Sequence, residues 1–140
     1  MNIQVLEQKS EEMKAFDKHE WKAYDQEHFG HVIVWDTKTY FLKAEDETGI
    51  LGTLEVKVEG GVGKINTLLV GKGNQRKGVG KALMEKAEEI TKQQNGHKLF
   101  LMTGKGWEAI KFYETMGFEK TAEVNNHYFN TDFIELTKFI

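Results

Sequence analysis

The sequence predicts one α/β domain of the α+β kind, in which helices flank a mixed and mostly antiparallel central sheet. Its 140 residues suit one domain with one hydrophobic core. Residues 39–71 carry three consecutive strand-like runs, which favours a meander. The second half of the chain then reads strand, helix, strand, helix and two strands, so one connection should cross over between parallel strands.

The composition excludes several classes of protein. Hydrophobic residues make up 39% of the chain, with 9 Phe, 4 Tyr and 3 Trp, which is enough for a globular core. The formal net charge of -3 argues against general binding to nucleic acid. Without any Cys, the chain forms no disulfide, cysteine-based zinc site or catalytic thiolate. No apolar run approaches the roughly 20 residues that span a bilayer, and no signal segment is seen, so we expect a cytoplasmic protein.

The N-terminal residues are expected to form a strand followed by two short helices. Residues 2–8, NIQVLEQ, alternate apolar and polar side chains as a half-buried strand does. Ser10 is a suitable N-cap, and two acids follow it at the start of a segment with helical apolar spacing. The polar run DKHE in the middle of that segment predicts a break between two helices.

The middle of the chain predicts a hairpin and a central strand. Residues 39–61 predict two strands joined by the turn-rich segment EDETG. Residues 62–71, VGKINTLLVG, predict the next strand. Its second half is apolar on both faces, which places it centrally in the sheet.

The second half of the chain predicts two helices and three strands. An apolar stripe predicts a helix over residues 78–95, and Asn95-Gly96 is a typical helix end. KLFLM at 98–102 predicts a short buried strand. A second helix is predicted within 107–118, and two final strands lie near FEKTAEV and FIELTKFI.

The segment GKGNQRKGVGK, at 71–81, is unusual for the start of a helix. Free N–H groups there favour acids, whereas this segment is rich in Lys and Arg. Each glycine within a helix costs about 1 kcal/mol relative to alanine. Both features become favourable when the backbone amides bind a multiply charged anion, because glycine lets the backbone approach the ligand closely. A phosphate site is therefore one interpretation, and a solvated turn with surface lysines is the other.

Two common phosphate motifs do not fit this segment. A P-loop that starts at Gly73 reaches Gly78 but has Val79 where the motif needs lysine. The dinucleotide pattern GxGxxG fails from Gly71, because Arg76 stands in its last place. Neither ATP hydrolysis nor a nicotinamide cofactor is supported.

Two motifs together resemble those of the GNAT superfamily of N-acetyltransferases. The family's pyrophosphate loop, Q/R-x-x-G-x-G/A, is matched by Gln75, Gly78 and Gly80. Its AxxFYxxxGF element is matched by AIKFYETMGF at 109–118, with a strand and a helix between the two motifs. The order of elements agrees over nearly the whole chain, although residues 1–61 carry no motif. The resemblance implies a splayed pair of parallel strands that binds the cofactor.

The resemblance also implies acetyl-CoA as cosubstrate, with no metal. Backbone N–H groups of residues 75–81 would hold its pyrophosphate, and the strand around Leu69 and Val70 would pair with its pantetheine arm. The residues that we expect at the cofactor are Leu68, Leu69, Val70, Gln75, Arg76, Lys77, Gly78, Val79, Gly80, Lys81, Ala109, Phe112 and Tyr113.

The implied reaction moves an acetyl group to a primary amine of a small molecule or protein. An ammonium with a pKa of about 10.4 must first lose a proton. The family often places Glu on the central strand for this step, but this chain has Thr67 there. Glu55, on the neighbouring strand, is the replacement candidate, acting through water; an exposed carboxylate without a catalytic role is the alternative.

Two further catalytic roles follow from the resemblance. The backbone N–H of Leu69 or Val70 would stabilise the oxyanion of the tetrahedral intermediate. Tyr113 would donate a proton to the departing thiolate, and the resemblance favours this role, although its helical spacing with neighbouring apolar residues by itself indicates a core residue.

Two other functions stay open at this point. Gly106 stands where the family often has an Asn that contacts the cofactor, which together with Thr67 favours a module that binds acetyl-CoA without turnover. In a protein of unrelated function, the loop would bind a different phosphate ligand.

The expected partner is a small-molecule or peptide amine, with no nucleic acid or membrane, and homodimers are common among such folds. His127, between the last two strands, is expected to be exposed or hydrogen-bonded.

Overall fold

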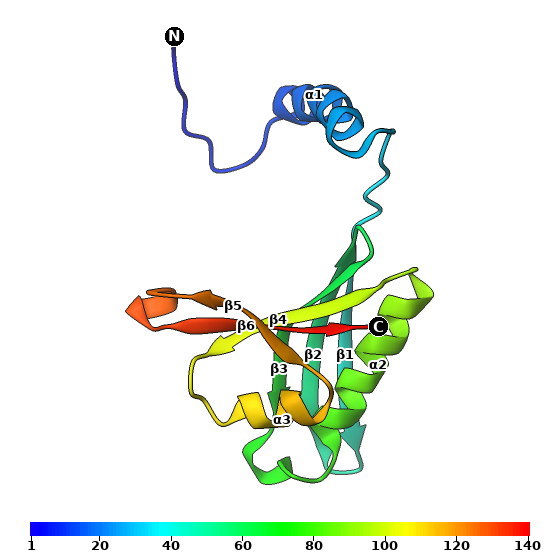
Figure 1. The fold of residues 1–140 in the computed structure, drawn as a ribbon, viewed down its shortest axis with the longest axis vertical. Coiled ribbons are helices and arrows are strands. Elements are labelled where there is room, and N and C mark those ends of the chain that lie inside the picture. The colour runs from blue at the N-terminus through cyan, green and yellow to red at the C-terminus, as the bar shows by residue number, and fades with distance from the viewer. The chain divides into compact units, whose positions relative to one another are not determined.

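The computed structural model describes all residues, 1–140. The chain separates into two compact units, Met1–Trp35 and Asp36–Ile140. The first unit holds helix α1 (Glu11–Phe29), and the second holds the sheet and the other helices (Figure 1). No helix is both long enough and apolar enough to cross a membrane.

Helix α1 is continuous, so the expectation of two short helices is wrong. Ser10 caps it as expected, since its side-chain oxygen accepts a hydrogen bond from the Met13 N–H at 3.2 Å. The helix ends at Gly30, whose φ of 81° is a left-handed conformation that glycine adopts without steric cost. The run DKHE contains neither Gly nor Pro, and polar residues of this kind lower helix stability too little to break it.

Residues 2–8 form no strand, contrary to the prediction from their alternating pattern. They lie in an irregular segment, and the side chains of Ile3 and Val5 are exposed. A strand is stable only when a neighbouring strand satisfies its backbone groups, and none of the six strands pairs with this segment. Alternation was therefore not sufficient to predict a strand here.

The second unit is built on one mixed sheet of six strands, ordered β1-β2-β3-β4-β6-β5. All neighbouring strands are antiparallel except β3 and β4, as the sequence predicts. The strands are β1 (Lys38–Asp46), β2 (Gly49–Glu59), β3 (Val62–Val70), β4 (Lys98–Gly104), β5 (Glu119–Val124) and β6 (Phe133–Phe139). The helices of this unit are η1 (Lys72–Asn74), α2 (Val79–Gln93), α3 (Ala109–Thr115) and η2 (Tyr128–Asn130).

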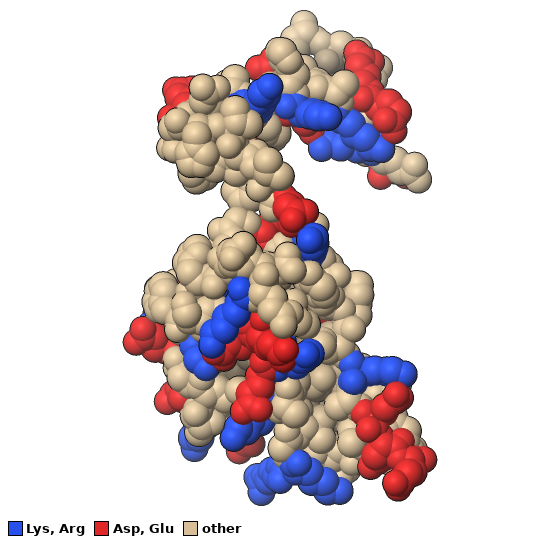
Figure 2. Space-filling view, turned by 90° about the vertical axis from the view of Figure 1, so that its right-hand side faces the viewer, with Lys and Arg blue, Asp and Glu red and all other residues tan.

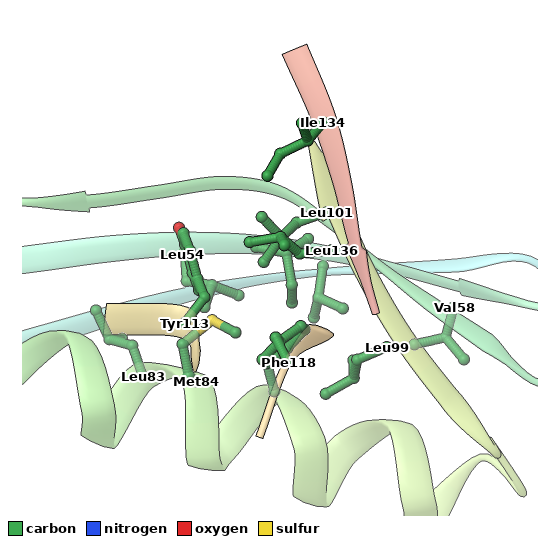
Figure 3. Packing of buried hydrophobic residues seen from close by; sticks show 13 residues of the cluster. Leu54, Val58, Leu83, Met84, Leu99, Leu101, Tyr113, Phe118, Ile134 and Leu136 are labelled. Atoms are coloured by element: carbon green, nitrogen blue, oxygen red, sulfur yellow. The ribbon is translucent and has the colours of Figure 1, made fainter. Parts of the chain in front are cut away.

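The core lies between α2, α3 and one face of this sheet. Figure 3 shows buried side chains from the helices and the strands converging there. Each fully buried Val, Leu or Met side chain contributes about 1.5–3 kcal/mol relative to exposure. Members of this core are Leu54, Val56 and Val58 of β2, Leu83, Met84 and Ala87 of α2, Leu99 and Leu101 of β4, and Ile134 and Leu136 of β6.

The parallel strands β3 and β4 separate after a short paired stretch. They pair only from Val62–Lys64 to Lys98–Phe100. On its other side β3 carries a bulge against β2, where the register shifts between Glu55 and Val56. A bulge bends a strand and increases its twist, which is consistent with the divergence from β4.

The central position predicted for β3 is confirmed, but the burial expected for its second half is not. Leu69 is 67% exposed, because its side chain points to the face of the sheet opposite the core. The apolar run that suggested a fully buried strand instead borders an opening in the sheet.

Candidate active site

A cavity of about 1050 Å³ lies beside the splayed end of β3. Leu68 and Val70 line it from β3, Gly80 from the first turn of α2, and Phe112 and Tyr113 from α3. The cavity therefore joins the two motif segments that the sequence singles out, on the face of the sheet that α2 covers.

The backbone amides at the start of α2 have no backbone acceptors. The first hydrogen bond of this helix runs from the Ala82 N–H to the Gly78 carbonyl, at 3.0 Å. Gly78 is the N-cap with a φ of 82°, it provides no side-chain cap, and the first turn contains no acid. These free N–H groups and the positive end of the helix dipole favour a bound anion.

Gly80 allows a close approach of three segments at the cavity wall. A Cβ at this position would lie 3.3 Å from the Phe112 ring and 3.4 Å from a methyl of Val70. The contact with Phe112 is tighter than an ordinary van der Waals distance, and the contact with Val70 is at the lower limit of that distance. A larger side chain at residue 80 would therefore push into the cavity or displace its wall.

The basic side chains between β3 and the first turn of α2 differ in whether they line the cavity. Arg76 and Lys81 line the cavity, but Lys77 does not. Hydrogen bonds from Thr48 and, to a smaller extent, the charge of Lys77 lower the pKa of Asp46. The positive charge of Lys77 therefore acts on a carboxylate of the β1–β2 turn. Figure 2 shows Lys and Arg side chains gathered at the lower end of this unit, where Figure 1 places the turn between β3 and α2.

Tyr113 belongs both to the core and to the cavity wall. Its side chain is 9% exposed, and its ring centroid lies 5.1 Å from that of Phe112 and 5.9 Å from that of Phe118. Figure 3 shows the phenol pointing away from α2 towards the strands. Burial raises the pKa of Tyr113, so the hydroxyl stays protonated at neutral pH. The two roles weighed for this residue are thus compatible.

Glu55 lies on the opposite face of the sheet from the cavity. It pairs with Thr67 of β3, and residues that pair directly across antiparallel strands point to the same face. Leu54 and Val56 point into the core, so Glu55 and Thr67 point to the other face, which we call the open face. Leu69 follows Thr67 on that face, so its side chain does not line the cavity, although its backbone borders the opening.

The structure thus gathers most of the expected cofactor residues around one cavity. All of them line it except Leu69 and Lys77. The candidate base Glu55 stands outside it, next to Thr67. Gly106, where the resemblance suggested Asn, has a φ of 80°, a conformation that both glycine and asparagine tolerate.

Sequence reasoning missed an ion-pair network in the cavity wall. Glu88 of α2 contacts Lys138 of β6 at 2.7 Å and Lys92 at 3.0 Å. Burial alone would raise the pKa of Glu88, but the hydrogen bonds from the two lysines outweigh it, and the pKa is lowered. The spacing of Lys81, Glu85 and Glu88 could have indicated that these three side chains share one face of α2. Nothing in the sequence pairs Lys138 with it, because that contact depends on the sheet order.

His127 differs from its expectation. Its Nε2 atom is buried and has no hydrogen-bond partner. The expectation that this residue is exposed or hydrogen-bonded is therefore wrong for that atom.

Comparison with known proteins assigns the family. The family model described as the acetyltransferase (GNAT) domain matches residues 5–137. This protein therefore belongs to the GNAT acetyltransferases, as the two motifs suggested. No curated protein matches the chain.

Solved structures share the fold at low sequence identity. An acetyltransferase from Bacillus cereus has a TM-score of 0.72 and 18% identity over 98% of both chains. A GNAT family acetyltransferase from Elizabethkingia anophelis, solved with acetyl-CoA bound, has a TM-score of 0.67 and 20% identity over 73% of this chain and 76% of its own. The ribosomal-protein-S18-alanine N-acetyltransferase from Escherichia coli has a TM-score of 0.67 and 20% identity over 73% of this chain and 69% of its own.

Proposed function

We propose that this protein transfers an acetyl group from acetyl-CoA to a primary amine of a small molecule or peptide in the cytoplasm. The observation that carries the proposal is a single cavity that connects the free amides of α2, the unpaired edge of β3 and Tyr113. Its donor set suits an elongated ligand with an anionic group at one end and amide groups along its length.

The residues present fit acetyl-CoA. The amides of residues 75–81 would bind its pyrophosphate, and Arg76 and Lys81 would add positive charge there. The β3 backbone near Leu69 and Val70 has lost its β4 partner, so its polar groups on that side are free to pair with the pantetheine amides. When bound, acetyl-CoA supplies a thioester whose carbonyl carbon accepts the amine.

The proposed chemistry uses three groups of this chain. Glu55, acting through water, removes a proton from the amine so that its lone pair can attack. The N–H of Leu69 or Val70 stabilises the negative charge that develops on the carbonyl oxygen. A C–N bond forms, the C–S bond breaks, and the sulfur leaves with the electron pair and receives a proton from Tyr113. The nitrogen releases its second proton to water, and Tyr113 regains a proton from water.

A thiol-release assay over a panel of amines tests this proposal. We expect release of free coenzyme A that depends on both acetyl-CoA and an amine acceptor, with the acetylated amine as the second product. The proposal is contradicted if ATP or NADPH raises the melting temperature of the protein more than acetyl-CoA does.

A second candidate is an acetyl-CoA-binding module or sensor without turnover. It is favoured by Thr67 at the usual position of the base and by the placement of Glu55 outside the cavity. Binding of acetyl-CoA without thiol release for any acceptor would support it over the enzyme.

A further inference from the structure

Lys138 of β6 occupies a core-facing position in the sheet. Buried Ile134 and Leu136 precede it on the same face of β6, and it pairs with the buried Leu99 of β4. The side chain of Lys138 is 26% exposed, and that of its partner Glu88 is 17% exposed. Taking two charges out of water costs free energy, and an apolar pair of similar volume is often at least as stable. Stability alone therefore does not account for a lysine at this position.

Lys138 contacts the two helices that carry the cavity's motif residues. Its Nζ atom donates a hydrogen bond to Glu88 Oε2 of α2 at 2.7 Å. Its alkyl chain lies over Gly117, which follows the C-terminal end of α3. A Cβ built on Gly117 would lie 3.3 Å from Cε and 3.7 Å from Cδ of this lysine. One side chain of the sheet therefore joins α2 to the end of α3.

Helix α3 has no other ionic contact. It spans only Ala109–Thr115, and helices shorter than about 12–15 residues are marginal without tertiary contacts. No ion pair of the chain includes a residue of α3. Its one side-chain hydrogen bond runs within the helix, from Thr115 Oγ1 to the carbonyl of Phe112 at 2.6 Å. The placement of α3 therefore depends on apolar packing and on the contact of Lys138 with Gly117.

The ion pair is part of the cavity wall. Glu88 and Lys138 both line the cavity, together with Phe112 and Tyr113 of α3. A movement of α3 relative to α2 would therefore change the width of the cavity and the place of the Tyr113 hydroxyl. Glu88 also contacts Lys92 at 3.0 Å, so two cations compensate its charge beside a cavity that favours an anion.

We propose that Lys138 is a positioning residue for acetyl-CoA, which sets the separation of α2 and α3 through its contacts with Glu88 and Gly117. The inference rests on the proposed function, because it takes acetyl-CoA as the ligand of the cavity. Lys138 acts through α3, which presents Phe112 and Tyr113 to that ligand. When the ion pair is lost, α3 is free to move relative to α2, and a ligand that contacts both helices binds less tightly.

Amide hydrogen exchange of the free protein, followed by NMR, tests the link between Lys138 and α3 without a ligand. The reporters are the amides of Met116, Gly117 and Phe118, which are hydrogen-bonded to carbonyls of α3. We expect these amides to exchange about tenfold faster in Lys138→Met, because local opening of α3 becomes easier, and as slowly as in the wild type in Lys138→Arg. Unchanged exchange in Lys138→Met, or an equal rise in the amides of β2, would overturn the proposal.

Binding of acetyl-CoA, measured by calorimetry, tests the consequence for the cavity. We expect Lys138→Met and Glu88→Gln each to weaken binding about tenfold, since a residue that acts through a neighbouring element has effects of that order. The double variant should bind no more weakly than either single variant, because both changes break the same contact. If only charge mattered, Glu88→Gln would bind acetyl-CoA more tightly than the wild type, and that result would overturn the proposal.

Lys86→Met is the matched control. Lys86 pairs with Glu89 at 2.9 Å on the same helix, and neither residue lines the cavity. The control should keep wild-type exchange and affinity, and equal effects in Lys86→Met and Lys138→Met would overturn the proposal. Faster exchange in Lys138→Met together with no acetyl-CoA binding by the wild type would support the link to α3 and contradict the proposed function. Weaker binding without faster exchange would do the reverse.

Discussion

At the scale of single residues, Tyr113 shows why one pattern supports two interpretations. The spacing of Ala109, Phe112, Tyr113 and Met116 places this tyrosine on an apolar helical face, and the structure buries its ring among core residues. Its place in the cavity wall depends on the approach of β3 and α2, which no spacing within α3 encodes. The proposed catalytic role therefore needs a functional test.

Tyr113→Phe removes only the hydroxyl and keeps the ring. We expect kcat to fall by about 100-fold if this hydroxyl is the proton donor, since acid catalysis by a positioned side chain has effects of that order. Affinity for acetyl-CoA, measured by calorimetry, should stay near that of the wild type. An unchanged kcat would remove Tyr113 from the mechanism.

The pH dependence of stability should also reflect Tyr113. Because burial raises its pKa in the folded state, the neutral phenol is favoured there, and the contribution is intact below the unfolded value of about 10. Stability should fall as the pH rises above about 10, and less steeply in Tyr113→Phe than in the wild type. Urea unfolding between pH 8 and 11 measures both curves, and parallel curves would contradict the assignment.

Gly80 and Gly73 form a matched pair for testing the anion site. Gly80→Glu places a carboxylate against Phe112 and Val70 in the cavity, and we expect acetyl-CoA binding to be lost in calorimetry. Gly73→Glu adds the same charge to the same turn, but a Cβ there meets no atom within 4 Å. Affinity in Gly73→Glu should fall much less, and equal losses would mean that net charge, not the cavity, is responsible.

At the scale of elements, local patterns predicted the helices and strands of the second unit but not their divergence. The β1–β2 hairpin and helix α2 follow from turn residues and apolar periodicity, which act within short stretches of chain. The strand expected at 2–8 required a partner that its own residues cannot specify. The bulge in β3 and its early separation from β4 likewise arise from pairing between distant segments, so the run TLLV looked fully buried.

The contact between α2 and β6 should contribute measurable stability. Glu88→Gln leaves Lys138 without its anionic partner at a half-buried site, and we expect a loss of about 1–2 kcal/mol in the free energy of unfolding at pH 7. Because the pKa of Glu88 is lowered in the folded state, the wild-type contribution is present above the unfolded value of about 4.3 and is lost as the pH falls below it. Urea unfolding from pH 7 to 3 should show the two proteins converging. A constant difference across that range would contradict the account.

At the scale of the whole molecule, two motifs some thirty residues apart predicted most of the candidate site, and the fold supplied the rest. The pyrophosphate loop and the AIKFYETMGF element named nearly all the residues that meet at the cavity. The side chains of Leu69, Lys77 and Glu55 lie outside the cavity, because the face to which each points depends on the bulge and on neighbouring turns, and the roles given to these residues stay predictions. That residues 1–140 form a single domain stays a prediction, although the family match spans both units.

A crystal structure of this protein with acetyl-CoA tests the central claim most directly. We predict that the pyrophosphate accepts hydrogen bonds from the backbone amides of residues 75–81 and that the thioester lies between the separated ends of β3 and β4. Acetyl-CoA bound elsewhere, with these amides turned away from any phosphate, would contradict the account.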